Sequence, residues 1–384
     1  MKPYITVLIW ILLGAIIGLV IFMFLQPNTP QIQQPNISLP QNNSPPPQNL
    51  TPETPTKMPV VLVVINAPCA ECNFGDIGVE QTKTIISNST KIYLSSVQNI
   101  SYPSEDANMI ISEYNITELP SLVVIGDSAA DPDFVALWNK SAGSVEPDGT
   151  LVSRYPYPPF YNITAAKPMG LIKGIAIQAS NCSYCLDATE FMPGLEDPQI
   201  AMVFTSQTIL NESDPEAQVL IQTYNITKLP VLLLSEDAAV YPIFAQISVL
   251  GTIENGWFVL REVKPPYVEL PTHEIHGVVN VIYLYNSSCK DCFDIHELGY
   301  YLSESAGLYI DNETNYDSNS SEAKTLIGKY NLTALPALLY SPQIATYPAF
   351  EKVWKQINNS VESDGWFVFR NYAVLNKTYQ NISN

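Results

Sequence analysis

Residues 277–292, GVVNVIYLYNSSCKDC, decide the fold of this 384-residue chain. They form an apolar run rich in Val, Ile and Tyr, a short polar turn, and two cysteines three positions apart. An apolar run of this length bounded by turn residues is typical of a strand buried on both faces of an α/β sheet. We therefore expect Cys289 and Cys292 to lie where a strand is followed by a helix.

The start of a helix would favour reactivity of the first cysteine. Unpaired amides and the helix dipole stabilise an anion there, and a thiolate is an anion. The pattern predicts that the first cysteine is the nucleophile. The second, one helical turn later, would lie on the same face and close enough to form a disulfide.

The same stretch occurs three times in the chain. PVVLVVINAPCAEC ends at Cys69 and Cys72, and GLIKGIAIQASNCSYC ends at Cys182 and Cys185. Successive first cysteines are 113 and 107 residues apart, which is the length of one ordinary domain. The spacing predicts three domains of similar structure.

A second signature follows each cysteine pair. It reads TELPSLVVI around Pro120, TKLPVLLLS around Pro230 and TALPALLYS around Pro336, at 51, 48 and 47 residues after the first cysteine. Proline cannot donate a hydrogen bond to a β-ladder, so it belongs at the first residue of a strand or in a cis turn.

A CxxC pair at a helix start, followed by a strand that opens on a hydrophobic residue and proline, resembles the thioredoxin fold. The resemblance covers residues from about 59 to 372. It implies that Pro120, Pro230 and Pro336 lie in a cis-proline loop against the cysteine pair and shape the substrate-binding site. It also implies thiol–disulfide exchange with protein thiols or disulfides. The expected fold class is α/β, with three tandem thioredoxin-like domains at residues 59–165, 166–272 and 273–384, called below the first, second and third repeats.

The chain begins with a candidate membrane anchor. Residues 4–25 carry no charge, and 22 residues at about 1.5 Å each span a hydrocarbon core of roughly 30 Å. We expect residues 1–25 to be a single-pass signal anchor with its N-terminus inside, and Gly14 and Gly18 form a GxxxG that could pair two such helices. Residues 26–58 hold nine prolines, which predicts an extended stalk or a plain linker.

Composition and charge indicate the cellular compartment and the class of partner. A net charge of −19 argues against nucleic acid as a partner. The 18 Asn-x-Ser/Thr sequons favour an exported glycoprotein, so we expect the repeats outside the cytoplasm. The six cysteines form three local pairs, as in an oxidising compartment or in catalytic dithiols. We expect no cofactor and no metal, and zinc held between two CxxC pairs is a weak alternative.

Several residues depart from the thioredoxin pattern. The Trp that precedes the first cysteine is replaced by Pro68, Asn181 and Ser288, and the buried acid six residues upstream by Val63, Ala176 and Tyr283. Carboxylates such as Glu71 and Asp291 beside the cysteines oppose thiolate formation. These departures leave open a non-enzymatic surface or interaction glycoprotein with structural disulfides. An acidic ion buffer resembling calsequestrin is a weaker variant of that alternative.

Within each repeat we expect strand, CxxC, helix, strand, helix, Pro-strand, short helix, turn and strand. Phe350, Val353, Trp354 and Ile357 have the spacing of the short helix, and Phe134, Leu137 and Trp138 match them in the first repeat. No amphipathic helix follows the last strand, so one face of each sheet is expected to pack on the neighbouring repeat. His296 is either a proton acceptor for the third pair or a solvated helix residue.

The functional prediction is a membrane-anchored thiol–disulfide oxidoreductase. In each active repeat the first cysteine, Cys69, Cys182 or Cys289, would attack a substrate sulfur, and the second would resolve the mixed disulfide.

Overall fold

The computed structural model describes residues 57–72, 75–141, 143–357, 359–375 and 377–382. The expected anchor, its GxxxG pair and the stalk up to residue 56 lie outside these residues. No helix in the described ranges is long and apolar enough to cross a membrane. The chain divides into two compact units, residues 1–171 and 172–384. The first unit contains one five-stranded sheet and the second contains two, so the division into three domains stays a prediction.

The first repeat is built on a sheet of strand order β2-β1-β4-β6-β5, in which β1 runs parallel to β2 and antiparallel to β4. The elements are β1 (Met58–Asn66), α2 (Gly75–Asn88), β2 (Ile92–Ser101), α3 (Glu105–Glu113), β4 (Ser121–Gly126), η1 (Ser128–Ala130), α4 (Pro132–Ser141), β5 (Gly143–Val145) and β6 (Leu151–Ser153). The apolar run expected to be a doubly buried strand is β1, whose central residues are buried.

The second and third repeats have the matching orders β10-β9-β12-β14-β13 and β18-β17-β20-β22-β21. The second repeat contains β9 (Leu171–Gln178), η2 (Ala188–Glu190), α5 (Phe191–Leu195), β10 (Val203–Asn211), α6 (Pro215–Thr223), β12 (Val231–Ser235), η3 (Glu236–Val240), α7 (Phe244–Ile247), η4 (Ser248–Leu250), β13 (Gly251–Glu254) and β14 (Trp257–Leu260). The third contains β17 (Val278–Tyr285), α8 (Ile295–Ala306), β18 (Tyr309–Asp317), α9 (Ser321–Lys329), β20 (Ala337–Tyr340), η5 (Pro342–Thr346), α10 (Pro348–Gln356), β21 (Ser360–Val361), β22 (Phe367–Val368) and η6 (Tyr372–Leu375).

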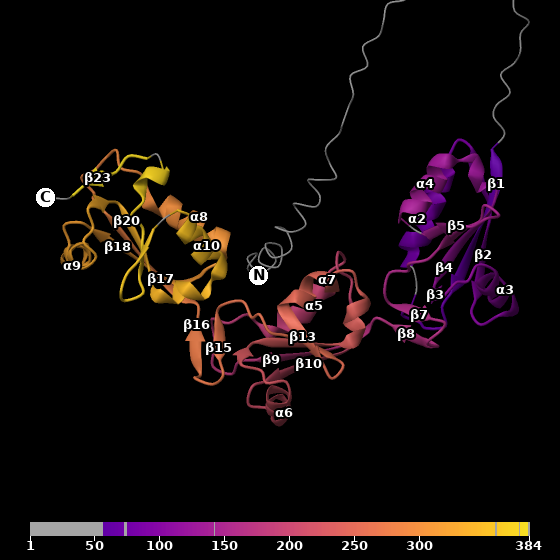
Figure 1. Ribbon diagram of the computed structural model, residues 1–384, viewed down its shortest axis with the longest axis horizontal. Helices are drawn as coiled ribbons and strands as arrows, with labels where there is room; N and C mark the ends of the chain where they lie inside the picture. The colour runs from indigo at the N-terminus through magenta and orange to yellow at the C-terminus, as the bar shows by residue number, and fades with distance from the viewer. Residues whose placement is uncertain (1–56, 73–74, 142, 358, 376, 383–384) are drawn as a thin grey trace, which may run out of the picture. The chain divides into compact units, whose positions relative to one another are not determined.

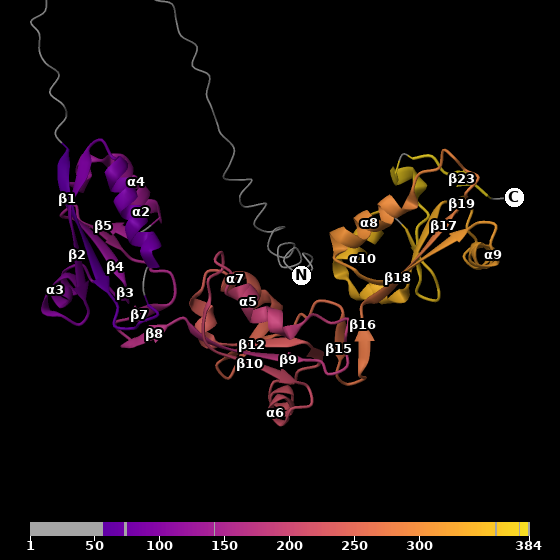
Figure 2. The ribbon, with the colours of Figure 1, turned by 180° about the vertical axis from the view of Figure 1, so that it is seen from behind.

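Both faces of each sheet are covered by helices of the same repeat (Figure 1, Figure 2). In the first repeat α2 and α4 cover one face through Ile86, Phe134 and Trp138, and α3 covers the other through Ala107 and Ile111. The sheet of the first repeat is therefore covered on both faces without help from a neighbouring repeat, and packing between the repeats stays a prediction.

The short helix is confirmed as α10 in the third repeat. Phe350 and Trp354 are each 1% exposed, and Val353 and Ile357 pack against the same core. In the first repeat Phe134 and Trp138 are buried as expected, but Leu137 is 45% exposed because it lies on the outer side of α4.

A second, smaller sheet in each repeat begins at the short strand that ends directly before the motif proline. These sheets are β3-β7-β8, formed by Glu118–Leu119, Phe160–Asn162 and Lys167–Met169; β11-β15-β16, formed by Lys228–Leu229, Tyr267–Glu269 and Glu274–His276; and β19-β23, formed by Ala334–Leu335 and Gln380–Asn381. The segment that follows the last strand of each five-stranded sheet thus returns and pairs with the short strand before the proline. The expected boundaries between repeats, 165/166 and 272/273, fall in the turns of the β7–β8 and β15–β16 hairpins.

An arginine just after the last strand of each five-stranded sheet links several elements of its repeat. Arg370 donates from Nε to Ser360 Oγ at 2.9 Å and from Nη2 to Glu362 Oε1 at 2.7 Å and to the Tyr330 carbonyl at 2.6 Å. Tyr330 caps the end of α9, whose last carbonyls lack intrahelical partners. Arg261 makes the corresponding contacts in the second repeat, and Arg154 does so in the first repeat except that it donates to the carbonyl of Asn115, one residue after the capping Tyr114. This arginine therefore fixes the helix end that leads into the proline strand.

Candidate functional site

All three cysteine pairs are closed disulfides, as predicted. The Cα atoms are 5.3 Å apart in Cys69–Cys72, 5.4 Å in Cys182–Cys185 and 5.6 Å in Cys289–Cys292. These separations lie in the usual range for a disulfide. None of the six cysteines is free.

The cysteines lie before the helix, not in its first turn. In the third repeat the pair is in a turn, and α8 starts only at Ile295, where the Asp294 side chain caps it by accepting a hydrogen bond from His296 N at 3.0 Å. In the second repeat Asp187 caps η2 in the same way, and Pro193 and Gly194 restrict the following helix to five residues. The expectation that the helix start activates the first cysteine is wrong for these two repeats, because an aspartate carboxylate, and not the cysteine, lies at the N-cap of the helix.

The three motif prolines are in cis peptide bonds, at Leu119–Pro120, Leu229–Pro230 and Leu335–Pro336. Sheet register places each of them beside the strand that leads into the cysteines. The residue after the proline pairs with a residue near the end of that strand: Ser121 with Ile65, Val231 with Ile177, and Ala337 with Leu284. The structure thus confirms the cis-turn alternative for these prolines.

In the third repeat the cysteine pair and the proline line one pocket. The pocket has a volume of about 470 Å³ and is open to solvent. Cys289, Cys292 and Pro336 contribute to its wall, together with His296 and Asn315 from the adjoining α8 and β18. Cys289 and Cys292 are both partly exposed. A small thiol or one side chain of a protein could therefore reach the disulfide.

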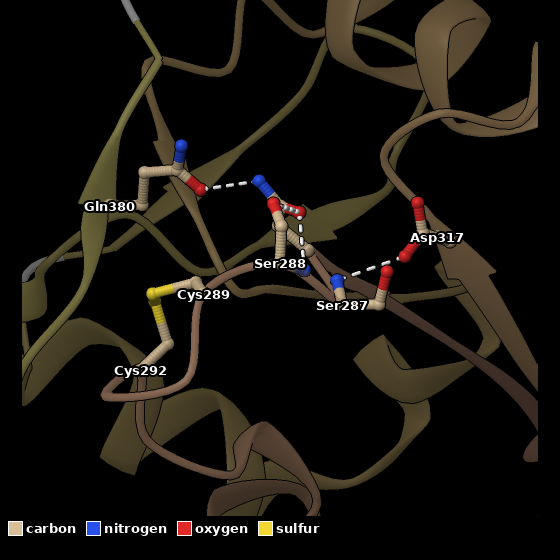
Figure 3. Close-up of a disulfide and its surroundings, with 7 residues drawn as sticks. Ser287, Ser288, Cys289, Cys292, Asp317 and Gln380 are labelled. Atoms are coloured by element: carbon tan, nitrogen blue, oxygen red, sulfur yellow. Dashed lines mark hydrogen bonds between the residues drawn. A yellow bond between two sulfur atoms is a disulfide. The ribbon is translucent and has the colours of Figure 1, made fainter.

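The loop that carries Cys289 is held by side chains that the sequence analysis did not single out (Figure 3). Asn286 Oδ1 accepts hydrogen bonds from Ser288 N at 3.0 Å and from Ser288 Oγ at 2.6 Å, which closes a tight turn before the cysteine. Asp317 Oδ2 accepts from Ser287 N at 2.9 Å. Hydrogen bonds from the side chain and backbone of Ser287 and from Asn319 lower the pKa of Asp317 to about 2. The loop is therefore anchored to the end of β18 by a carboxylate that stays ionised.

His296 lies between two acceptor oxygens beside the disulfide. Its Nδ1 is 2.6 Å from Asp294 Oδ1, its Nε2 is 2.5 Å from Asn315 Oδ1, and its ring lies 4.3 Å from that of Tyr283. Burial alone would lower the pKa of His296, but the acceptors Asn315 and Asp294 outweigh it and the pKa is raised. His296 is therefore part of the pocket, and its two ring nitrogens face the oxygens of Asp294 and Asn315.

In each of the other two pairs one of the two cysteines is buried. In the second repeat Cys182, the expected nucleophile, is only 9% exposed, and its Sγ accepts a hydrogen bond from Cys185 N at 3.0 Å. In the first repeat Cys72 is 2% exposed and Cys69 is partly exposed. Nucleophilic attack needs access to the first sulfur, so Cys69 and Cys289 meet that requirement better than Cys182.

Two of the residues that the sequence analysis missed could have been found from local signals. Asn286 opens the stretch NSSC, which is a typical side-chain-stabilised turn, and Asp317 opens the polar stretch DSNSS, which is another turn signal. Gln380, which contacts Asn286, is 91 residues beyond Cys289, and no spacing rule relates the two. Among the described residues no group of three His, Cys, Asp or Glu side chains could hold a metal ion.

No protein-family model matches the chain, and no curated protein matches it either. Among solved structures it is similar to ERdj5 in crystal form II, with 12% identity over 82% of this chain and 38% of that one and a TM-score of 0.16. It is also similar to human ERp44, with 12% identity over 73% and 77% of the two chains and a TM-score of 0.14. A domain of the alkylhydroperoxide reductase AhpF from Enterococcus faecalis has 18% identity over 45% and 83%, with a TM-score of 0.15.

Proposed function

We propose that the chain is a thiol–disulfide oxidoreductase that acts on protein disulfides. The observation that carries the proposal is the third-repeat pocket, where Cys289, Cys292 and cis-Pro336 line one open cavity. The same pairing of a CxxC turn with a cis-proline strand recurs in the other two repeats. A mere structural cross-link does not require an accessible pocket at the disulfide.

The reaction is two successive exchanges of sulfur partners. In the reduced pair the Cys289 thiolate attacks one sulfur of a substrate disulfide, the substrate S–S bond breaks, and the leaving sulfur departs as a thiolate that takes a proton from water. The Cys292 thiolate then attacks the Cys289 sulfur, and the second substrate sulfur is released. The substrate gains two electrons and the pair loses two. Run in reverse, the same steps place a disulfide in a substrate dithiol.

A second candidate is a non-enzymatic glycoprotein with structural disulfides. The observation that favours it is in the second repeat, where Cys182 is buried and lies inside the sequon Asn181-Cys182-Ser183. On this alternative the cysteine pairs only brace the loops that join strand and helix.

Equilibration of the full chain with glutathione buffers of increasing potential tests the proposal. We expect separable transitions for the folded protein, since the dipeptides Ala-Glu, Ser-Tyr and Lys-Asp between the cysteines differ in charge. Cys69→Ser, Cys182→Ser and Cys289→Ser should each remove one transition from any active repeat. If no pair equilibrates while the protein stays folded, the disulfides are structural and the second candidate is correct.

We further propose that residues 4–25 anchor the chain in a membrane with the repeats outside the cytoplasm. The support is the uncharged 22-residue stretch and the density of sequons. Protease added to intact cells should then digest everything after the stalk. Full protection of the repeats would contradict this orientation.

A further inference from the structure

The same turn ends the helix before the short proline strand in all three repeats. It follows α3, α6 and α9 and reads YNIT, YNIT and YNLT. The asparagine of each turn has a left-handed backbone, with φ of 50°, 48° and 49° at Asn115, Asn225 and Asn331. The next amide donates to the carbonyl five positions earlier, at 3.0, 2.9 and 2.9 Å from Ile116, Ile226 and Leu332. Each turn is therefore a Schellman motif.

The Schellman motif explains three of the four residues of the turn. The tyrosine caps the helix, and the isoleucine or leucine after the asparagine is buried in the core of its repeat. Asparagine tolerates the left-handed conformation, although glycine is more usual there. The chain does place a glycine in this conformation at the end of α8, where Gly307 has a φ of 60°. The backbone therefore permits asparagine in these turns but does not require it.

The fold does not explain the threonine of the turn. The backbone carbonyls of Thr117, Thr227 and Thr333 each accept a hydrogen bond from a later strand or the residue beside it, and any residue could supply that carbonyl. Valine or isoleucine would suit a strand start equally well. The side chains of all three threonines and all three asparagines are exposed, and within the described ranges none of them makes a hydrogen bond to another residue.

We propose that Asn115, Asn225 and Asn331 are N-glycosylation sites, one in each repeat. The pattern Asn-x-Thr is the acceptor that this modification needs, and here both polar side chains of the pattern are open to solvent. The buried residue between them holds the acceptor at the surface. The proposal rests on the proposed location of the repeats outside the cytoplasm, and it is independent of the redox activity.

The modification transfers one oligosaccharide to each asparagine. The donor is a lipid-linked oligosaccharide in which C1 of the first sugar is bonded to a phosphate oxygen. The asparagine Nδ2 attacks C1, the C1–O bond breaks, and the lipid phosphate leaves with the electron pair. The nitrogen loses one proton to water, so the transfer needs neither an oxidant nor a reductant.

The sequon beside the third cysteine pair provides an internal comparison. Asn286 Nδ2 donates to Gln380 Oε1 at 2.6 Å, and its Oδ1 accepts hydrogen bonds from the amide and the hydroxyl of Ser288. Both acceptor groups of this sequon are therefore already used within the fold. We expect Asn286 to carry no sugar.

Glycopeptide mass spectrometry of the chain purified from its own cells tests the proposal without any substitution. We expect a sugar on the peptides that contain Asn115, Asn225 and Asn331, and none on the peptide that contains Asn286. If two or more of the three asparagines are bare, the proposal is overturned. External protease then separates the causes. If it digests the repeats, the location stands and only this inference fails, whereas protected repeats would refute the proposed location as well.

Threonine substitutions remove the acceptor pattern and keep the backbone carbonyl. Thr117→Val has the shape of threonine without the hydroxyl, so in the full chain made by its own cells it should lower the occupancy of Asn115 at least about tenfold. Thr117→Ser keeps the hydroxyl and is the matched control, in which the sugar should remain. The corresponding pairs of substitutions at Thr227 and Thr333 should act on Asn225 and Asn331. Equal occupancy in the valine and serine variants would overturn the proposal.

Discussion

Replacement of Arg370 by alanine should loosen the strand that carries Pro336. The guanidinium donates to Ser360, Glu362 and the Tyr330 carbonyl, and the side chains of Arg370 and Glu362 are 33% and 23% exposed. A hydrogen bond to a charged group contributes about 1.5 to 3 kcal/mol when well shielded, whereas an exposed ion pair contributes about 0.2 to 1 kcal/mol. For this partly shielded cluster we expect Arg370→Ala to cost about 2 to 3 kcal/mol of local stability.

Native-state hydrogen exchange of the β20 amides is the suitable assay, because it reports the third repeat separately from the other two. Arg370→Lys keeps the charge but not the planar fork, so it should lose about half as much as alanine does. Lys324→Ala, at an exposed position on α9, serves as the control and should change β20 protection by less than about 0.5 kcal/mol. If Arg370→Ala also falls below that limit, the guanidinium is effectively solvated and does not fix the helix end.

Three further predictions concern a glycine, a histidine and a sequon. Gly251→Ala places a Cβ 2.2 Å from the Val259 carbonyl oxygen and should lower the free energy of unfolding in urea by about 1 to 3 kcal/mol. Gly328→Ala, in open space on α9, should raise it by about 0.5 to 1 kcal/mol. Equal effects of the two substitutions would show that β13 can shift to make room. NMR titration should give His296 a pKa above its ordinary value, so the stability that it contributes is complete below about pH 6.5 and is lost as pH rises through the raised pKa. Asn315→Ala should lower the pKa of His296. An unchanged titration in that variant would show that the contact is absent in solution. If the second repeat exchanges disulfides, glycopeptide mass spectrometry should find Asn181 unmodified, whereas substantial occupancy would leave Cys69 and Cys289 as the candidate nucleophiles.

The sequence determined the sheet strands and the chemistry they carry. The apolar run that ends before each cysteine pair is typical of a largely buried strand, and it is observed as β1, β9 and β17. Local spacing sufficed for the disulfides, because cysteines three residues apart can meet without help from distant residues. The inability of proline to donate to a ladder left a strand start or a cis turn for the three prolines, and the structure has the cis turn.

Only the tertiary structure decided where the helices start, which cysteines are buried and which distant segments contact the cysteine loops. The helix start was misplaced because Asp294 offers a better cap than the cysteine turn, and a cap is a competition between neighbouring side chains that a motif does not rank. The burial of Cys182 and the contact of Gln380 with Asn286 join residues that share no periodicity. Strand pairing across such distances depends on the path of the connecting chain, so a sequence pattern can predict the strands but not which edge a later segment will occupy.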